Sequence, residues 1–502
     1  MPIYYEMSSV TPLEPQPGYY GGDSTRPTQG RPAGRLLRRR MARCSGQSWG
    51  LAGTRFERWN SCALILLMTC FCVPVHADGL MAFYTQALEH DPLYRAAVVG
   101  RDVGREERAI GRAALMPKLS YQYQAGRNRS QVTQPDRWGG TRTTDRSYRS
   151  YSSILTLQQP LLDYEALSRY QYGIAQAYHA DEQFRSRSQE LAVRVAKAYS
   201  DALYAQDQIV LSRVQTRAFA EQMALNRGML DAGEGTRTDL LETEARYDLS
   251  VAQEIEAQAN LDAALQTLGA MVGRVLHVDE LAPLAPTFGT LTLEDTDFEH
   301  WRREALLHNP ILAAQRYALD AAQQRIEQAR AGHLPSVNLY ASTGRQKSSS
   351  EATFDQRYQT NSIGLQVNIP IFAGGGVSAT VRQAVSRREQ ERYEGYARQS
   401  EILNALRQQF NLFRSSAAKM RAYQYAVESA RELTTAMQNS VAGGERVNAD
   451  VLQAEQQYVD ALRDLAQARY AYLLSWLTLR LHAGILAPED IRTIDGFFVS
   501  GW

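Results

Sequence analysis

The placement of proline constrains this chain more than any other feature of its sequence. Two long stretches contain none: residues 161–282, a run of 122, and residues 371–487, a run of 117. Proline costs about 3 kcal/mol inside a helix, so its absence permits very long helices. Both stretches are rich in alanine, glutamine, glutamate, arginine and leucine, which favour helix. We therefore predict a mainly α-helical protein.

Apolar residues in both stretches recur at alternating spacings of three and four, which is typical of a coiled coil. One seam consists of Leu403, Leu406, Phe410, Phe413, Ala417 and Met420, and the other of Leu191, Val195, Ala198, Ala202, Ala205 and Ile209. A second stripe beside the latter consists of Ala192, Ala196, Tyr199, Leu203 and Val210. Two stripes on one helix predict neighbours on both sides, as in a wall of helices. A soluble antiparallel coiled coil is the alternative.

Each proline-free stretch is interrupted near its middle by glycine. The interruptions are Ala232-Gly233-Glu234-Gly235 and Ala442-Gly443-Gly444-Glu445. Glycine after a helix end is a stop signal, and Thr238 or Asn448 offers a cap for the next helix. We predict two long helical hairpins with tips near 232–239 and 442–450.

The chain contains an internal repeat. Residues 87–117 align with 305–335 at a constant offset of 218, and nine of the 31 positions are identical. Asp91-Pro92 and Asn309-Pro310 correspond, each being a helix cap followed by proline at the first helical position. The glycine turns also match, at an offset of 211. We predict a duplication in which each copy has a helix, a pair of strands and a long helical hairpin.

Two segments between the prolines alternate apolar and polar residues. The apolar positions are Leu119, Tyr121 and Tyr123 in one copy, and Val337, Leu339, Ala341, Ile363, Leu365, Val367 and Ile369 in the other. A period of two predicts strands with one apolar and one polar face. We expect strand hairpins at 118–160 and 336–370, with polar loops at 125–147 and 344–358.

Four strands per chain are too few for a barrel, which needs about eight. We therefore predict that several chains pool their hairpins into one transmembrane barrel, with apolar faces towards lipid and polar faces towards water. That arrangement requires an oligomer. A soluble sheet is the alternative reading of the same alternation.

The first 77 residues differ from the rest of the chain. They hold nine Arg, four acids and all four cysteines, and an apolar run from Ala63 to Val75 follows Arg58. A basic flank, a short apolar core and small residues at the exit predict a secretory signal peptide cleaved after Ala77. Lipidation at Cys70 is the alternative. Translation could start at Met1 or at Met41.

Several kinds of chemistry have no sequence support after residue 77. This part carries 46 Lys and Arg against 50 Asp and Glu, which argues against a nucleic-acid partner. Its seven histidines lack metal-ligand spacing, and no nucleophile motif is found. Gly374-Gly375-Gly376 lacks the Lys-Ser/Thr of a phosphate loop. We expect no enzyme activity, no catalytic or metal-binding residues and no cofactor.

The combined layout resembles the TolC family of outer-membrane export channels over residues 80–487. The motifs that carry the resemblance are the repeated Asn/Asp-Pro openings, Met116-Pro117 and Leu334-Pro335, Gln159-Pro160-Leu161, Ile369-Pro370-Ile371-Phe372 and the two glycine tips. The resemblance implies a homotrimer with a 12-stranded β-barrel in the outer membrane. Below the barrel, a 12-helix α-barrel of long coiled coils would cross the periplasm.

The resemblance also implies a gate at the helical tips. The family closes its entrance with an arginine held against a Thr-Asp pair of a neighbouring hairpin. Arg446 matches the arginine, and Thr238 and Asp239 match its partners. Val441 stands where the family has a linking tyrosine, a departure that bears on how strongly the entrance closes. A solvated charge or a helix cap is the alternative role for Arg446 and Asp239.

A pore constriction is implied at the same end. Asp450 matches one acidic ring of the family, where three carboxylates around one axis would attract cations. Gln453 occupies the position of the second ring and is not an acid. This departure bears on the affinity of the constriction for cations.

The sequence thus predicts five parts: a leader and signal peptide at 1–77, a first repeat at 78–282, a linker at 283–300, a second repeat at 301–487 and a tail at 488–502. The predicted function is that of the outer-membrane channel of a type I protein secretion machine, similar to the CyaE-like subgroup. Its partners would be a periplasmic adaptor, an inner-membrane ABC transporter, outer-membrane lipid and an exported protein.

Two alternatives remain. One is a multidrug efflux channel served by a proton-driven pump. The other, from a different class, is a periplasmic coiled-coil scaffold that forms no channel.

Overall fold

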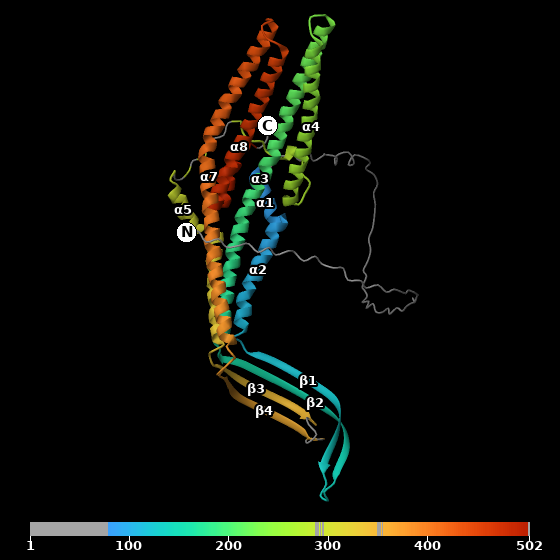
Figure 1. The fold of residues 1–502 in the computed structure, drawn as a ribbon, viewed down its shortest axis with the longest axis vertical. Coiled ribbons are helices and arrows are strands. Elements are labelled where there is room, and N and C mark those ends of the chain that lie inside the picture. The colour runs from blue at the N-terminus through green and yellow to red at the C-terminus, as the bar shows by residue number, and fades with distance from the viewer. Residues whose placement is uncertain are drawn as a thin grey trace, which may run out of the picture. The chain divides into compact units, whose positions relative to one another are not determined.

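The computed structural model describes residues 79–499, apart from 287–290, 292, 294–295, 349–352 and 354. The predicted leader and signal peptide at 1–77 lie outside the described residues. All described residues fall within one of the two units into which the chain divides, residues 73–502. Within it, helices dominate and a small sheet is present, which confirms the predicted class (Figure 1).

The same order of elements occurs twice along the chain. The first set comprises α1 (Leu80–His90), α2 (Pro92–Ala113), β1 (Lys118–Pro135), β2 (Thr141–Leu162), α3 (Tyr164–Asp231) and α4 (Arg237–Val272). The second comprises α5 (Phe298–His308), α6 (Pro310–Ala331), β3 (Ser336–Lys347), β4 (Arg357–Asn368), α7 (Gly376–Ala442) and α8 (Asn448–Ala483). A short 3₁₀ helix, Val278–Glu280, follows the first set, and α9 (Pro488–Asp495) follows the second.

The Asp/Asn-Pro motifs work as the sequence predicts. The Asp91 carboxylate accepts a hydrogen bond from the Tyr94 amide at 2.6 Å, and Pro92 is the first residue of α2. The Asn309 side chain accepts from the amides of Ile311 and Leu312, at 2.9 and 3.2 Å. Each motif therefore ends one helix and starts the next.

The two longest helices, α3 and α7, occupy the proline-free stretches. They have 68 and 67 residues, which corresponds to about 100 Å each at 1.5 Å per residue. Most of the predicted seam and stripe residues are buried or half-buried, so the coiled-coil interpretation is confirmed. Val210 is an exception: it is 54% exposed, because the predicted stripe leaves the packed face there.

The four strands form one antiparallel sheet in the order β1-β2-β3-β4. The predicted polar loop at 125–147 is wrong for most of its length, and the predicted loop at 344–358 is wrong at its two ends, where residues 344–347 and 357–358 belong to strands. The ladder between β1 and β2 runs as far as Pro135 opposite Thr141, and that between β3 and β4 as far as Lys347 opposite Arg357. Backbone pairing continues through polar residues because it does not depend on apolar side chains.

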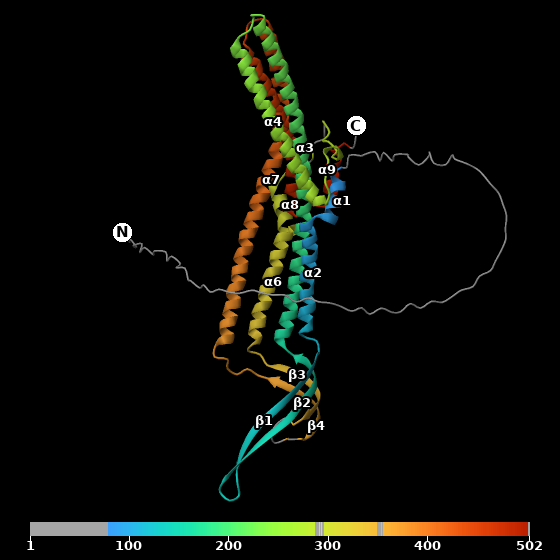
Figure 2. The ribbon, with the colours of Figure 1, turned by 90° about the vertical axis from the view of Figure 1, so that its right-hand side faces the viewer.

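Helices α2, α3, α6 and α7 lie side by side in that order, and all four strands lie beyond one end of this layer (Figures 1 and 2). Hairpin turns place the free ends of α3–α4 and α7–α8 at the opposite end (Figure 2). The largest core packs α1 and α9 against α3 and α8. No helix in the described ranges combines the length and apolar character needed to cross a membrane.

Candidate functional site

The turn between α3 and α4 is closed by its own backbone. The Met229 carbonyl accepts from the amides of Glu234 and Gly235, at 2.9 and 3.0 Å, and Gly233 has φ +77°. A positive φ of this kind favours glycine, which explains the motif. The cap of α4 is Thr236, whose hydroxyl accepts from the Asp239 amide at 3.1 Å and donates to its carboxylate at 2.5 Å. The predicted cap, Thr238, is an exposed helical residue.

The turn between α7 and α8 has the same backbone form but a different cap. The Ser440 carbonyl accepts from the Glu445 amide at 2.9 Å, and Gly444 has φ +76°. The N-cap of α8 is Val447, which has no side chain able to accept a hydrogen bond. The predicted cap, Asn448, is instead the first residue of α8 and is buried.

The predicted gate residues all lie at these turns. Within one chain, the Arg446 guanidinium is 3.7 Å from the Asp450 carboxylate, and both side chains are partly exposed. Among the described residues of one chain, Arg446 thus pairs with Asp450 rather than with Thr238 or Asp239. The Asp239 carboxylate instead accepts a hydrogen bond from the Thr236 hydroxyl. Gln453 is exposed and follows Asp450 by three residues, so both lie on one face of α8.

A buried cluster of polar side chains joins the two hairpins, and the sequence analysis missed it. Gln222 donates to the Asn448 side-chain oxygen at 2.8 Å. Asn226 and Asn448 both donate to the Thr243 hydroxyl, at 2.8 and 3.2 Å. We call Gln222, Asn226, Thr243 and Asn448 the amide cluster. If the spacing of the α3 seam is continued beyond Ile209, it reaches Asn226. A polar residue at a seam position could have predicted a buried polar contact there.

Replacing Thr243 by valine is expected to loosen the ends of both hairpins. Valine keeps the volume but leaves the amides of Asn226 and Asn448 without their acceptor, at a cost of about 1–3 kcal/mol. Hydrogen exchange of backbone amides near both turns should therefore become faster by roughly ten-fold or more. Thr267→Val, at an exposed position on the same helix, is the control. Equal exchange in the two variants would show that the amide cluster contributes nothing.

Glu455, on α8 close to the second turn, is the titratable group near this end with a shifted pKa. Burial raises the pKa of its carboxyl, and a hydrogen bond from the Gln438 amide at 3.3 Å opposes the rise. Because the pKa of the Glu455 carboxyl is higher in the folded state than in the unfolded state, the protonated carboxyl stabilises the folded state relative to the charged one. The hairpin therefore loses stability as the pH rises through the pKa of Glu455.

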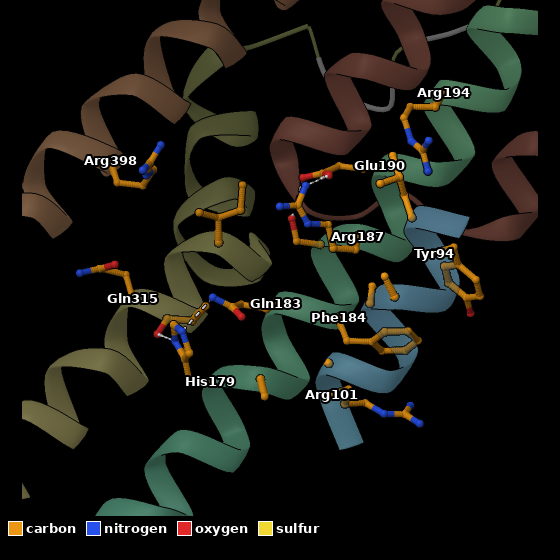
Figure 3. Close-up of a pocket in the computed structure, with 18 residues that line it drawn as sticks. Tyr94, Arg101, His179, Gln183, Phe184, Arg187, Glu190, Arg194, Gln315 and Arg398 are labelled. Carbon is orange, nitrogen blue, oxygen red and sulfur yellow. Dashed lines mark hydrogen bonds and ion pairs between the residues drawn. The ribbon is translucent and has the colours of Figure 1, made fainter. Parts of the chain in front are cut away.

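A groove of about 760 Å³ is lined by residues of all four helices of the layer. Tyr94 and Arg101 come from α2, Phe184 from α3 and Arg398 from α7 (Figure 3). The groove therefore runs across one face of the α2–α3–α6–α7 layer, from one outer helix to the other.

The polar groups in this groove bind mainly one another. His179 donates from Nδ1 to the Ala314 carbonyl at 2.8 Å and accepts from Gln183 at 2.9 Å (Figure 3). Arg187 pairs with Glu190 at 2.8 Å. Within the described ranges, no group of three His, Cys, Asp or Glu residues is placed to hold a metal ion.

One face of the sheet is apolar and exposed. The strand register places Leu119 opposite Leu157, Leu157 opposite Ala341 and Ala341 opposite Ile363, so these residues share a face. Exposure on this face reaches 65% at Tyr121 and 77% at Ile363. The alternating positions carry Ser120, Gln122 and Gln124 and others like them on the opposite face. The predicted division into apolar and polar faces is confirmed.

The two edges of this sheet are open. Strands β1 and β4, of 18 and 12 residues, each pair with only one neighbour among the described strands. Their outer backbone groups have no ladder partner within the described part of the chain, which makes both edges templates for another strand.

Three comparisons bear on these features. The family model described as "Outer membrane efflux protein" matches residues 83–274 and 301–484. The alkaline protease secretion protein AprF of Pseudomonas aeruginosa is 48% identical over 447 residues, covering 89% of this chain and 92% of AprF. The proteases secretion protein PrtF of Dickeya chrysanthemi is 46% identical over 425 residues, covering 84% and 92%.

More distant similarities agree with these. Protein CyaE of Bordetella pertussis is 26% identical over 295 residues, covering 57% of this chain and 59% of CyaE. The solved structure of the outer-membrane channel OprN superposes with a TM-score of 0.69 at 19% identity, covering 81% of this chain and 89% of OprN. At this identity the superposition shows a shared fold.

Proposed function

Because this chain belongs to the outer membrane efflux protein family, we propose that it is the outer-membrane channel subunit of a type I protein secretion machine. It lies in the outer membrane and extends into the periplasm. Its similarity to AprF and PrtF, both named as protease secretion proteins, favours a protein cargo over small drug molecules. The chain acts as a passive duct, and we assign it no catalytic activity.

The observation that carries this proposal is the sheet with two open edges and an exposed apolar face. In lipid, every backbone polar group needs a partner, so an open sheet cannot remain there. Strands β1 and β4 of different chains would pair and close the sheet into a barrel. The apolar face would contact lipid, and the polar face would line a water-filled lumen.

A homotrimer would close both the four-stranded sheet and the four-helix layer of each chain into rings. Three sheets of four strands make a barrel of 12, and three layers of four helices make a tunnel of 12. Corresponding helices have matching lengths: 68 and 67 residues in α3 and α7, and 36 residues in both α4 and α8. These matches support an origin of the two structural repeats by duplication. The repeats would correspond to 78–282 and 301–487, with the linker 283–300 between them and a tail at 488–502.

The hairpin turns would form the periplasmic entrance of the tunnel. In the trimer, Arg446 would leave Asp450 for Thr238 and Asp239 of a neighbouring hairpin and hold the entrance closed. Asp450 and Gln453 would then face the axis as the narrowest part of the pore. The partners at this entrance would be a periplasmic adaptor and an inner-membrane ABC transporter, which supplies the energy that this chain lacks.

Planar-bilayer recording together with measurement of oligomeric state tests the channel. The mature protein, purified in detergent, is expected to have the mass of three chains by light scattering and to produce discrete conductance steps. A monomer without conductance would contradict the proposal and favour a periplasmic scaffold. Protein export by cells that contain the adaptor and transporter, with and without this chain, tests the assignment to secretion.

A further inference from the structure

The apolar face of the sheet ends in a row of basic side chains. Following the register across the strands, Arg127 lies opposite Arg149 on β1 and β2, and Lys347 lies opposite Arg357 on β3 and β4. Tyr151 pairs with Lys347, which puts Arg149 diagonally next to Lys347 and makes the row continuous. Arg129 and Arg345 lie one step to either side on the same face. We call these six residues the basic row: Arg127, Arg129, Arg149, Arg345, Lys347 and Arg357.

The basic row lies at the end of the four-stranded part of the sheet that is farther from the helices, and β1 and β2 alone continue beyond it as far as Pro135 and Thr141. Leu119, Val337 and Val367 occupy this same face where the strands meet the helices (Figure 2). Arg127 is eight residues along β1 from Leu119, or about 26 Å, and Arg357 is ten residues from Val367, or about 33 Å. At a strand tilt of roughly 40°, these lengths correspond to about 20–25 Å, close to the height of a transmembrane apolar band.

The row is electrostatically unfavourable by itself. Like charges directly opposite each other on neighbouring strands destabilise a sheet. Arg127 faces Arg149, and Lys347 faces Arg357. The five arginines are exposed, and Lys347 forms an ion pair with Asp355 at 2.9 Å. The remaining acid on this face of the two long strands is Asp145, opposite Gln131 and beyond Arg129. An external anion would offset the repulsion.

We propose that the basic row binds the phosphate groups of anionic lipid headgroups in the outer leaflet of the membrane. This inference depends on the transmembrane placement of the sheet proposed above. Arginine binds phosphate through paired N–H donors, and a row on neighbouring strands spaced about 4.8 Å apart can share one headgroup. In a trimer the rows would form a belt where the apolar band meets water. Tyr123 and Tyr151, on the same face, lie at this boundary, as interfacial aromatic residues do.

Lipid retention by the purified full-length trimer tests the proposal. The trimer is incubated in detergent with bisphosphorylated lipid A, and bound lipid is counted by native mass spectrometry. Changing Arg127, Arg149, Arg345 and Arg357 together to glutamine should reduce retention by roughly ten-fold or more. Lysine at the same four positions should retain most of the binding, since it keeps the charge.

The matched control is Arg142→Gln with Arg146→Gln. Both arginines belong to the same part of β2 but lie on the opposite face, since Arg142 pairs with Gln134 and Arg146 with Ser130. This variant should retain lipid as the wild type does. Dephosphorylated lipid A, which has the same acyl chains, should be retained far less by the wild type. Inorganic phosphate at millimolar concentration should compete only weakly, because it lacks the anchoring chains.

Several results would overturn the proposal. Equal retention by the glutamine and wild-type proteins, or equal retention of phosphorylated and dephosphorylated lipid, would show that the row does not bind headgroup phosphate. Complete displacement by inorganic phosphate would indicate a site for free phosphate. A wild-type protein that conducts as a trimer but fails these tests contradicts only the basic row. A wild-type monomer without conductance contradicts the channel itself.

Discussion

Leu365→Arg is expected to prevent assembly of the trimer in the membrane. Leu365 lies on the apolar face of β4, three residues before the end of this 12-residue strand, and is 62% exposed in the single chain. Arginine facing lipid costs about 2–4 kcal/mol at the bilayer midplane and about 0–1 kcal/mol near the interfaces, so a position between the two costs roughly 1–3 kcal/mol. Three copies would cost about 3–9 kcal/mol, which is a large fraction of the total stability of a typical domain. The measurement is the fraction of outer-membrane protein recovered as trimer after detergent extraction.

The neighbouring residue provides the control. Gln366 lies on the opposite face of the same strand, paired with Asn338, so Gln366→Arg would place the new charge in the polar lumen. That variant should assemble with a yield close to the wild type. If both variants assemble equally well, the face that carries Leu365 does not contact lipid. If neither variant assembles into trimers, β4 tolerates arginine on neither face. That result would argue against a polar lumen.

Arg446→Ser is expected to raise the conductance of the channel at its entrance. An exposed ion pair contributes about 1 kcal/mol or less, so three lost contacts in a trimer amount to at most about 3 kcal/mol. A change of that size shifts the ratio of open to closed states by at most roughly 150-fold. Single-channel recording in planar bilayers would detect it as a larger or longer-lived open level.

Arg431→Ser is the control for the gate. Arg431 is an exposed residue of α7, located before the turn that carries Arg446. Its loss should leave conductance unchanged. A second variant, Asp450→Asn, removes the own-chain partner of Arg446 and distinguishes the two contacts. Conductance that stays at the wild-type level in Arg446→Ser would mean that this residue does not hold the entrance closed.

Much of the fold follows from local rules that a sequence records directly. Proline is excluded from helix interiors for steric reasons, so its absence marked α3, α4, α7 and α8. The cap at Asp91 and the alternation from Leu119 to Gln124 depend on neighbouring residues only, and both predictions are confirmed. Seam positions such as Leu406 and Phe410 were predicted because a coiled coil buries every third or fourth residue.

Other features depend on contacts between distant segments. The polar ends of β1 and β2 look like a loop in sequence, yet cross-strand pairs such as Thr133 with Thr143, 3.0 Å apart, extend the ladder. Asn448 looks like a helix cap, but Gln222, from a helix more than two hundred residues away, binds its side chain instead. Whether Arg446 meets Thr238 and Asp239 depends on a second chain. That contact remains a prediction.

The open edges of the sheet also constrain how the protein can be made. A newly exported single chain would carry two unpaired strand edges and an apolar face, with Ile371 and Phe372 nearby at 95% and 87% exposure. Such a chain is prone to aggregate while it waits for its partners. Escort by periplasmic chaperones, and a synthesis rate matched to the rate of membrane insertion, would therefore limit how many finished channels a cell can build.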